Sequence, residues 1–159
     1  MYNNILVGVD SSETSDKALK VAAELAKKFG AELHVFHSVP HHYSIPINPV
    51  APYYANPIRE SSREILELRK AFEMAGKEIL TQARKFLEEN DLFIEDKTEF
   101  HLELDASPVE FSSQFASENG VDLIVIGCKG HHSRVRRVLM GTVATGIANE
   151  APCPVLVVR

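Results

Sequence analysis

The sequence predicts an α/β protein with an open parallel sheet covered by helices on both faces. Five short apolar segments, typical of buried strands, alternate with helical patterns along the chain. Several of these segments are continuous apolar runs, as expected where both faces of a sheet are covered. A length of 159 residues corresponds to about one domain. We therefore expect a single domain over 1–159.

The first half of the chain supplies two of the expected strands and the helix between them. Asn4 to Asp10 is a β-branched run that predicts the first strand. Ser11 and Ser12 are good N-caps for the helix that follows, in which apolar residues recur every three and four positions up to Gly30. Glu32 to Val39 predicts the second strand.

A long proline-rich loop, over 40–59, is expected after the second strand. Five of the eight prolines lie between Pro40 and Pro57. Such a length is unusual for a connection inside a compact domain. Several tyrosine and aliphatic side chains also make the segment more hydrophobic than a plain linker. We expect a lid or a contact arm that is mobile without ligand.

A long helix and an edge strand are expected next. Ser61 and Glu64 form a capping box that opens a helical pattern reaching about Asn90. Its apolar stripe consists of Ile65, Leu68, Phe72, Ile79, Ala83, Phe86 and Leu87. Met74 is also expected in the core. Alternation of apolar and polar residues over 100–104 predicts a third strand, with one wet face, at a sheet edge.

The last third of the chain contains the clearest helix start. Ser107, Pro108 and Glu110 combine an N-cap, a proline in the first turn and a reciprocal glutamate, and Gly120 ends the helix. The remaining expected elements are an apolar strand over 121–127, a short helix over 141–150 and a last strand over 155–159.

Composition narrows the class of protein. Seventeen basic residues against 22 acidic ones give a net charge of −5, which argues against a protein that coats nucleic acid. No apolar run reaches the roughly 18 residues of a membrane span. No basic region precedes an apolar stretch at the start, so we expect a cytoplasmic protein. Cys128 and Cys153 form no C-x-x-C pair and are expected to be reduced thiols.

Candidate ligand-binding residues follow the strands, because ligands of open parallel sheets bind beyond the strands' carboxyl ends. Asp10 follows the first strand, and Gly127 and Gly130 follow the fourth. Gly141 and Thr142 open the next helix, whose unpaired N–H groups attract phosphate. For any single glycine, the competing interpretation is a simple turn.

The usual nucleotide signatures are missing from the chain. It contains no G-x-G-x-x-G after the first strand and no G-x-x-x-x-G-K-[ST]. Arg134, Arg136 and Arg137 lie between Gly130 and Gly141, where they would neutralise a triphosphate, clamp a partner or form a solvated basic turn.

The histidines favour no catalytic or metal site. His37, near the end of a strand, is expected to be a hydrogen-bonded structural residue. The pairs 41–42 and 131–132 are adjacent histidines, which rarely ligate one ion, so we expect them on the surface and no metal held by the protein alone. No G-x-S-x-G motif or catalytic base is found, so we expect no catalytic residues.

Four stretches carry a resemblance to a known family. They are ILVGVDSS over 5–12, DLIVIGCKG over 122–130, GTV over 141–143 and CPVLVV over 153–158. Together they resemble the universal stress protein family from end to end. The resemblance implies a Rossmann-like fold of the adenine nucleotide alpha hydrolase type, with strand order 3-2-1-4-5. In the nucleotide-binding branch it also implies an ATP site written G-x2-G-x9-G-[ST]. Here ten residues, not nine, separate Gly130 from Gly141.

The resemblance assigns roles to individual residues. It places Asp10 at the ribose or a bound metal, and the backbone of Ser38 at adenine. Its phosphate shell consists of Gly127, Gly130, Gly141, Thr142 and Val143. Arg134, Arg136 and Arg137 are further candidates for phosphate or partner contacts. The implied cofactor is ATP or ADP, with or without Mg²⁺.

The expected function is a regulatory module of the stress response that binds an adenine nucleotide and dimerises. The homodimer is expected through the edge strand formed by Val155, Leu156, Val157 and Val158, an apolar ribbon whose free backbone groups would template another chain. Other protein partners are unknown. Two alternatives stay open: a slow ATP hydrolase without efficient turnover, and a nucleotide-free assembly module of the same family.

Overall fold

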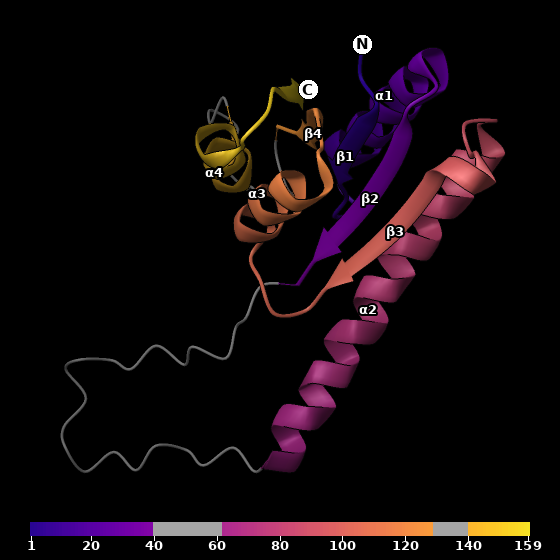
Figure 1. Cartoon of the computed structure of the whole chain (residues 1–159). Coiled ribbons are helices and arrows are strands. Elements are labelled where there is room, and N and C mark those ends of the chain that lie inside the picture. Colours follow the sequence, from indigo (N-terminus) through magenta and orange to yellow (C-terminus); the bar gives the residue numbers. More distant parts are fainter. Residues whose placement is uncertain (40–61, 129–139) are drawn as a thin grey trace.

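The computed structural model describes residues 1–39, 62–128 and 140–159 as an open parallel sheet with helices on both faces (Figure 1). The strands are β1 (Asn4–Gly8), β2 (Glu32–Ser38), β3 (Thr98–Glu103), β4 (Leu123–Gly127) and β5 (Val155–Val158). The helices are α1 (Glu13–Phe29), α2 (Ser62–Glu89), α3 (Pro108–Asn119) and α4 (Thr142–Glu150), with a 3₁₀ turn, η1 (Glu95–Lys97). The expected loop over 40–59 and the expected cap at Ser61 lie outside the described residues.

The sheet has the order β3-β2-β1-β4-β5, and every pairing is parallel. The expected strand order and both expected edges, β3 and β5, are therefore confirmed. Four of the strands are one to two residues shorter than expected, whereas β3 begins two residues before the expected 100–104 and ends at Glu103. β1 ends at Gly8, although the Val9 N–H still donates to the Phe36 carbonyl at 2.9 Å.

Two apolar cores lie on opposite faces of the sheet because successive strand side chains point in opposite directions. Ile5 and Val7 belong to the core beneath α1 and α2, whereas Leu6 belongs to the core beneath α3 and α4. All three are completely buried. A strand covered on both faces must be apolar at every position, which is why β1 and β4 are continuous apolar runs.

Side-chain caps define the starts of α1 and α3. The Ser12 hydroxyl accepts a hydrogen bond from the Ser15 N–H at 3.2 Å. Ser107 accepts from the Glu110 N–H at 3.2 Å, and the Glu110 carboxylate accepts from the Ser107 N–H at 2.9 Å. The predicted capping box of α3 is confirmed.

The prediction that Met74 and Leu68 belong to the core is wrong. Met74 is 72% exposed, and Leu68 is 44% exposed. Met74 lies two residues from the buried Gly76, and a two-residue step turns a helix by about 200°, onto the opposite side. The first turns of α2 run past the end of β3 in Figure 1, and Leu68 is close to the start of this helix, which begins at Ser62. The helix has 28 residues and β3 has six, so no described strand lies under its first turns.

Both cysteines are free thiols, as predicted. Cys128 is buried. Partial burial and, to a lesser degree, the Asp122 carboxylate raise the pKa of the Cys153 thiol, which therefore stays protonated at neutral pH. None of the described helices is long and apolar enough to cross a membrane.

Candidate functional site

The carboxyl ends of β1 and β4 form the centre of the candidate site. These neighbouring strands run in the same direction, but the chain leaves β1 toward β2 on one side and continues from β4 to β5 on the other. This reversal of strand order is where open parallel sheets leave a crevice for ligands. Helix α1 begins at this end of the sheet soon after β1, and the start of α4 lies at the same end, beside Cys128, which follows β4.

A compact hydrogen-bonded turn holds Asp10 at the end of β1. Its Oδ1 accepts from the Ser12 hydroxyl at 2.6 Å and from the Ser12 N–H at 3.1 Å. The Asp10 N–H donates to the Ser15 hydroxyl at 3.1 Å. Between them Ser11 has a φ of 58°, in the left-handed region that non-glycine residues rarely adopt. The half-buried Asp10 carboxylate is thus fixed in place by the start of α1.

The Asp10 end of the site is acidic. Partial burial, and next the charge of Asp10, raise the pKa of the Asp16 carboxyl in the first turn of α1. Two carboxylates that repel one another would also repel a phosphate. This position therefore suits a hydroxyl donor, such as a ribose, or a cation.

Gly127 allows the end of β4 to lie directly against the first turn of α1. A Cβ at this position would come within 2.8 Å of the Thr14 carbonyl carbon and 2.9 Å of the Ser15 nitrogen. Both are backbone atoms that cannot rotate away. The structure gives Gly127 a packing role that the sequence did not reveal, and its contact with phosphate stays a prediction.

The start of α4 is attached to the end of β4 by the backbone. The Gly141 N–H donates to the Cys128 carbonyl at 2.7 Å, and the Cys128 N–H donates to the Val158 carbonyl at 2.7 Å. Gly141 is the N-cap of α4, and no described side chain caps the first turn. Thr142 and Val143 are both exposed. The first N–H groups of α4 are therefore presented beside β4, as an anion site requires.

The side chains at the end of β2 are engaged within the protein. The buried Ser38 donates its hydroxyl to the Ala106 carbonyl at 2.5 Å, so only the backbone of Ser38 is offered to a ligand. His37 lies with Nδ1 2.7 Å from the Val9 carbonyl oxygen, to which it donates. The prediction that His37 is a hydrogen-bonded structural histidine is confirmed.

Several predicted site residues cannot be placed. Gly130, Arg134, Arg136 and Arg137 lie outside the described residues, as do the histidine pairs 41–42 and 131–132. The structure brings together the ends of β1 and β4 with the start of α4, and the predicted contribution of the segment between Gly130 and Gly141 stays a prediction.

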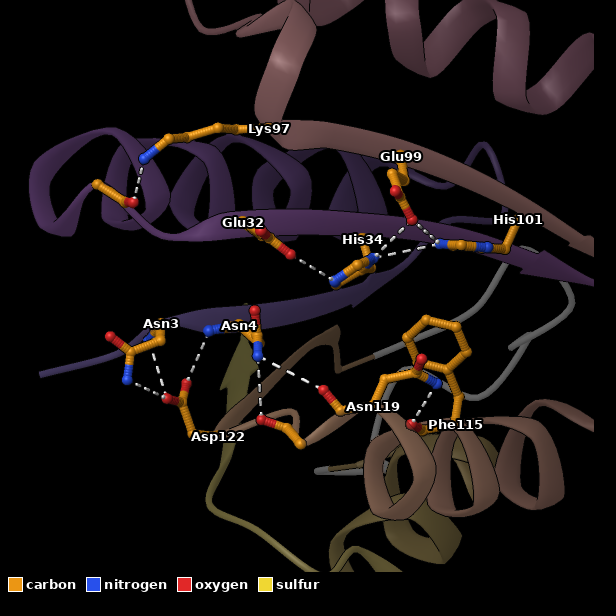
Figure 2. A network of polar contacts seen from close by, with 12 residues as sticks. Asn3, Asn4, Glu32, His34, Lys97, Glu99, His101, Phe115, Asn119 and Asp122 are labelled. Atoms are coloured by element: carbon orange, nitrogen blue, oxygen red, sulfur yellow. Dashed lines mark hydrogen bonds and ion pairs between the residues drawn. The ribbon is translucent and has the colours of Figure 1, made fainter.

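A second polar cluster, at the β3 edge of the sheet, was missed by sequence reasoning. His34, Glu99 and His101 lie on β2 and β3 with their ring nitrogens and carboxylate directed at one another (Figure 2). His34 lies 65 positions before Glu99 and 67 before His101, and no motif spacing joins it to them. Only the pairing of β2 with β3, which sets His34 opposite Glu99, brings them together.

Comparison with known proteins agrees with this architecture. A model of the universal stress protein family matches residues 1–159. A universal stress protein of Methanocaldococcus jannaschii is 34% identical over 160 residues, which cover 100% of this chain and 83% of the relative. The solved structure of the universal stress protein UspA from Lactobacillus plantarum has a TM-score of 0.75 and 26% identity, covering 99% of this chain and 98% of that one.

One solved relative contains a nucleotide. A universal stress protein from Archaeoglobus fulgidus, in complex with dAMP, has a TM-score of 0.62 and 26% identity to this chain. The alignment covers 99% of this chain and 98% of that one.

Proposed function

The chain belongs to the universal stress protein family, and on that premise we propose that it binds an adenine nucleotide at the carboxyl end of its sheet. The start of α4 is the observation that carries the proposal. Gly141 is bonded to Cys128 at the end of β4, and no described side chain caps the first turn that follows. A phosphate placed there would receive the N–H groups and the favourable helix dipole.

Each residue of the proposed site has a role that its surroundings favour. Asp10 accepts hydroxyl groups of the ribose or holds Mg²⁺, since its acidic surroundings disfavour phosphate. The backbone of Ser38 pairs with adenine, because its hydroxyl is already engaged by Ala106. Phosphates are held by the phosphate shell: Gly127, Gly130, Gly141, Thr142 and Val143. The arginines over 134–137 supply further positive charge.

The proposal is a binding module of the stress response in the cytoplasm, with ATP or ADP as its ligand. Slow hydrolysis is the first alternative, since a cation near Asp10 would polarise the phosphates. The sequence indicates no catalytic base to activate water, so efficient turnover is not expected. A nucleotide-free assembly module is the second alternative, favoured by the ten-residue spacing between Gly130 and Gly141.

Calorimetric titration of the full chain with Mg-ATP, Mg-ADP and Mg-GTP tests the proposal. We expect one adenine nucleotide to bind per chain, GTP to bind more weakly, and little phosphate to be released over hours. Mass spectrometry should find an adenine nucleotide carried through purification. Steady phosphate release would favour the hydrolase. No heat with any nucleotide, together with no carried ligand, would overturn the proposal in favour of the assembly module.

We also propose that two copies pair through β5. Leu156 is 38% exposed, while Val155, Val157 and Val158 are half-buried against the cores. The carbonyls of Pro154 and Val158 accept from β4. Because backbone groups alternate along a strand, the N–H of Val157 points toward the open edge. A two-fold axis would pair this edge with its own copy and close the assembly at two chains.

Val157→Pro tests the dimer without disturbing the β4–β5 ladder. Light scattering at micromolar concentration should give twice the chain mass of 17.7 kDa for the wild type and one chain mass for the variant. Val157→Ala, which keeps the N–H, should stay dimeric. A monomeric wild type, or a folded Val157→Pro variant that stays dimeric, would refute the interface.

A further inference from the structure

His34, Glu99 and His101 come from neighbouring strands and share one face of the sheet. The β2–β3 register sets His34 opposite Glu99, and His101 follows Glu99 by two residues, so all three side chains point the same way. In Figure 2, they converge on one point beside the ring of Phe115 from α3. This His34 cluster is three positions into β2, whereas the proposed nucleotide site lies beyond the strand's end.

The three ligand-type atoms form a nearly equilateral triangle. His34 Nδ1 is 3.3 Å from His101 Nε2 and 3.4 Å from a carboxylate oxygen of Glu99. The same Glu99 oxygen is 3.6 Å from His101 Nε2. A tetrahedral zinc ion has bonds of about 2.0–2.1 Å, so its ligand atoms are about 3.3–3.4 Å apart. Two edges of the triangle, at 3.3 and 3.4 Å, match this spacing, and the third, at 3.6 Å, is slightly longer.

The surroundings of the cluster resemble those of an open metal site. The His34 side chain is 8% exposed, and the Phe115 ring packs at 5.2 Å from the His34 ring and 4.7 Å from the His101 ring. The Glu99 side chain is 67% exposed. Phe115 thus covers the cluster on the α3 side, whereas solvent reaches it at Glu99 and would supply a water as the fourth ligand. Two imidazoles and one carboxylate with an open position are a common zinc ligand set.

Two further features support a cation at this place. The Glu32 carboxylate lies 3.9 Å from Nε2 of His34, the ring nitrogen turned away from the triangle, where ligating histidines usually have an acidic or carbonyl partner. Burial, and next the neighbouring His34, lower the pKa of His101 although Glu99 opposes them, and a neutral imidazole is the form that binds metal. Glu32 and Glu99 would offset the charge of a divalent ion.

We propose that His34, Glu99 and His101 bind one zinc ion, with water as the fourth ligand. The ion would join edge strand β3 to β2 and is independent of any nucleotide at the carboxyl end of the sheet. Zinc should therefore raise the melting temperature of the chain, because an ion that binds only where the two strands are paired stabilises the folded state.

The test uses the full chain, stripped of metal and titrated with zinc against a chromophoric chelator. The other histidines and the two cysteines add background sites, so the readout is the difference between variants. Glu99→Gln and His101→Gln should each weaken the tightest zinc equivalent by about tenfold or more. Glu95→Gln removes an exposed glutamate of η1 as the matched control and should leave the affinity unchanged. Equal affinity in all four proteins would overturn the proposal.

A measurement on the wild type keeps the test decisive if a variant fails to fold. One equivalent of zinc should shift the imidazole nitrogen resonances of His34 Nδ1 and His101 Nε2 and should sharpen both. Cobalt(II) at the same stoichiometry should give the visible absorption of a tetrahedral site. Zinc shifts confined to other histidines, or cobalt spectra without tetrahedral bands, would overturn the assignment.

Discussion

The two ends of the sheet satisfy their backbone groups in different ways. At the amino end, the Asp122 carboxylate accepts from the Asn3 N–H at 2.8 Å and from the Asn4 N–H at 3.3 Å (Figure 2). The Asn4 amide donates in turn to the carbonyls of Asn119 and Gly120 at 3.4 and 3.3 Å. At the carboxyl end, α4 begins at Thr142 without a cap from any described side chain.

This difference in hydrogen bonding suggests that the amino end of the sheet contributes mainly to stability and the carboxyl end mainly to ligand binding. The amino end of the sheet pairs its backbone N–H groups with protein side chains, which adds stability but leaves no donor for a ligand. A helix start that leaves its donors to solvent gives up about 1 kcal/mol of capping energy and keeps an anion site. The uncommon backbone of Ser11 and the close contact at Gly127 belong to the same carboxyl end. Variants at the two ends should therefore affect different properties.

The largest effect is expected at the carboxyl end, from Gly127→Ala. The added Cβ would meet the backbone of Thr14 and Ser15 at 2.8–2.9 Å, so α1 or β4 must move. We expect a loss of about 3 kcal/mol in the free energy of unfolding. Urea denaturation of the ligand-free chain measures it.

Gly120→Ala, at the amino end, is the control for this prediction. Gly120 has a φ of 63°, but among the described residues no atom beyond its chain neighbours lies within 4 Å of the position of a Cβ, so the cost comes from backbone conformation. That cost should be about 1 kcal/mol. If Gly127→Ala proves no more destabilising than Gly120→Ala, the tight contact between β4 and α1 is wrong.

The next effect is expected from Asp122→Ala. Loss of the carboxylate leaves the N–H groups of Asn3 and Asn4 without this acceptor, which should cost about 2 kcal/mol of unfolding free energy. Nucleotide affinity should not change, since Asp122 lies at the other end of the sheet. Parallel urea denaturation and calorimetric titration check both statements. If Asp122→Ala lowered nucleotide affinity and left the free energy of unfolding unchanged, the assignment of stability to the amino end and of binding to the carboxyl end would be wrong.

Thr142→Val should show the opposite behaviour. It removes one hydroxyl from the start of α4 and keeps the size of the side chain. We expect nucleotide affinity to fall by about 1 to 2 kcal/mol, or about five- to thirtyfold, because one hydrogen bond to a charged group is lost. Thr142 is exposed, so unfolding free energy should stay within about 0.5 kcal/mol. Unchanged affinity would remove Thr142 from the phosphate shell.

The smallest effect concerns pH and Asp16. Its pKa is raised above 3.8 in the folded chain, so the folded state binds this proton more tightly than the unfolded state. The stability that Asp16 contributes is present at low pH and is lost as pH rises through the raised value. Asp16→Asn should therefore gain stability relative to the wild type as pH rises from about 4 to about 7. Melting temperatures across this range check it, and parallel curves would contradict it.

Helices and strands could be predicted wherever the sequence pattern that specifies them involves only neighbouring residues. Ser107 and Glu110 lie three residues apart, and both hydrogen bonds of their capping box are present. The runs that became β1 and β4 are apolar because both faces of the sheet are covered. Residue type was misleading at Met74, which lies off the apolar stripe of its helix and is exposed although methionine is an apolar residue.

The family, the fold and the candidate nucleotide residues were determined by the sequence itself, because each depends on motifs of a few neighbouring residues. Only the tertiary structure decided which distant groups meet. It placed the Gly127 backbone against α1 and set His34 opposite Glu99. A shift of one residue in the β2–β3 register would place the side chain of His34 on the opposite face of the sheet from those of Glu99 and His101, because side chains alternate between the faces of a strand. Register depends on the whole packed sheet, and no local pattern in either strand encodes it.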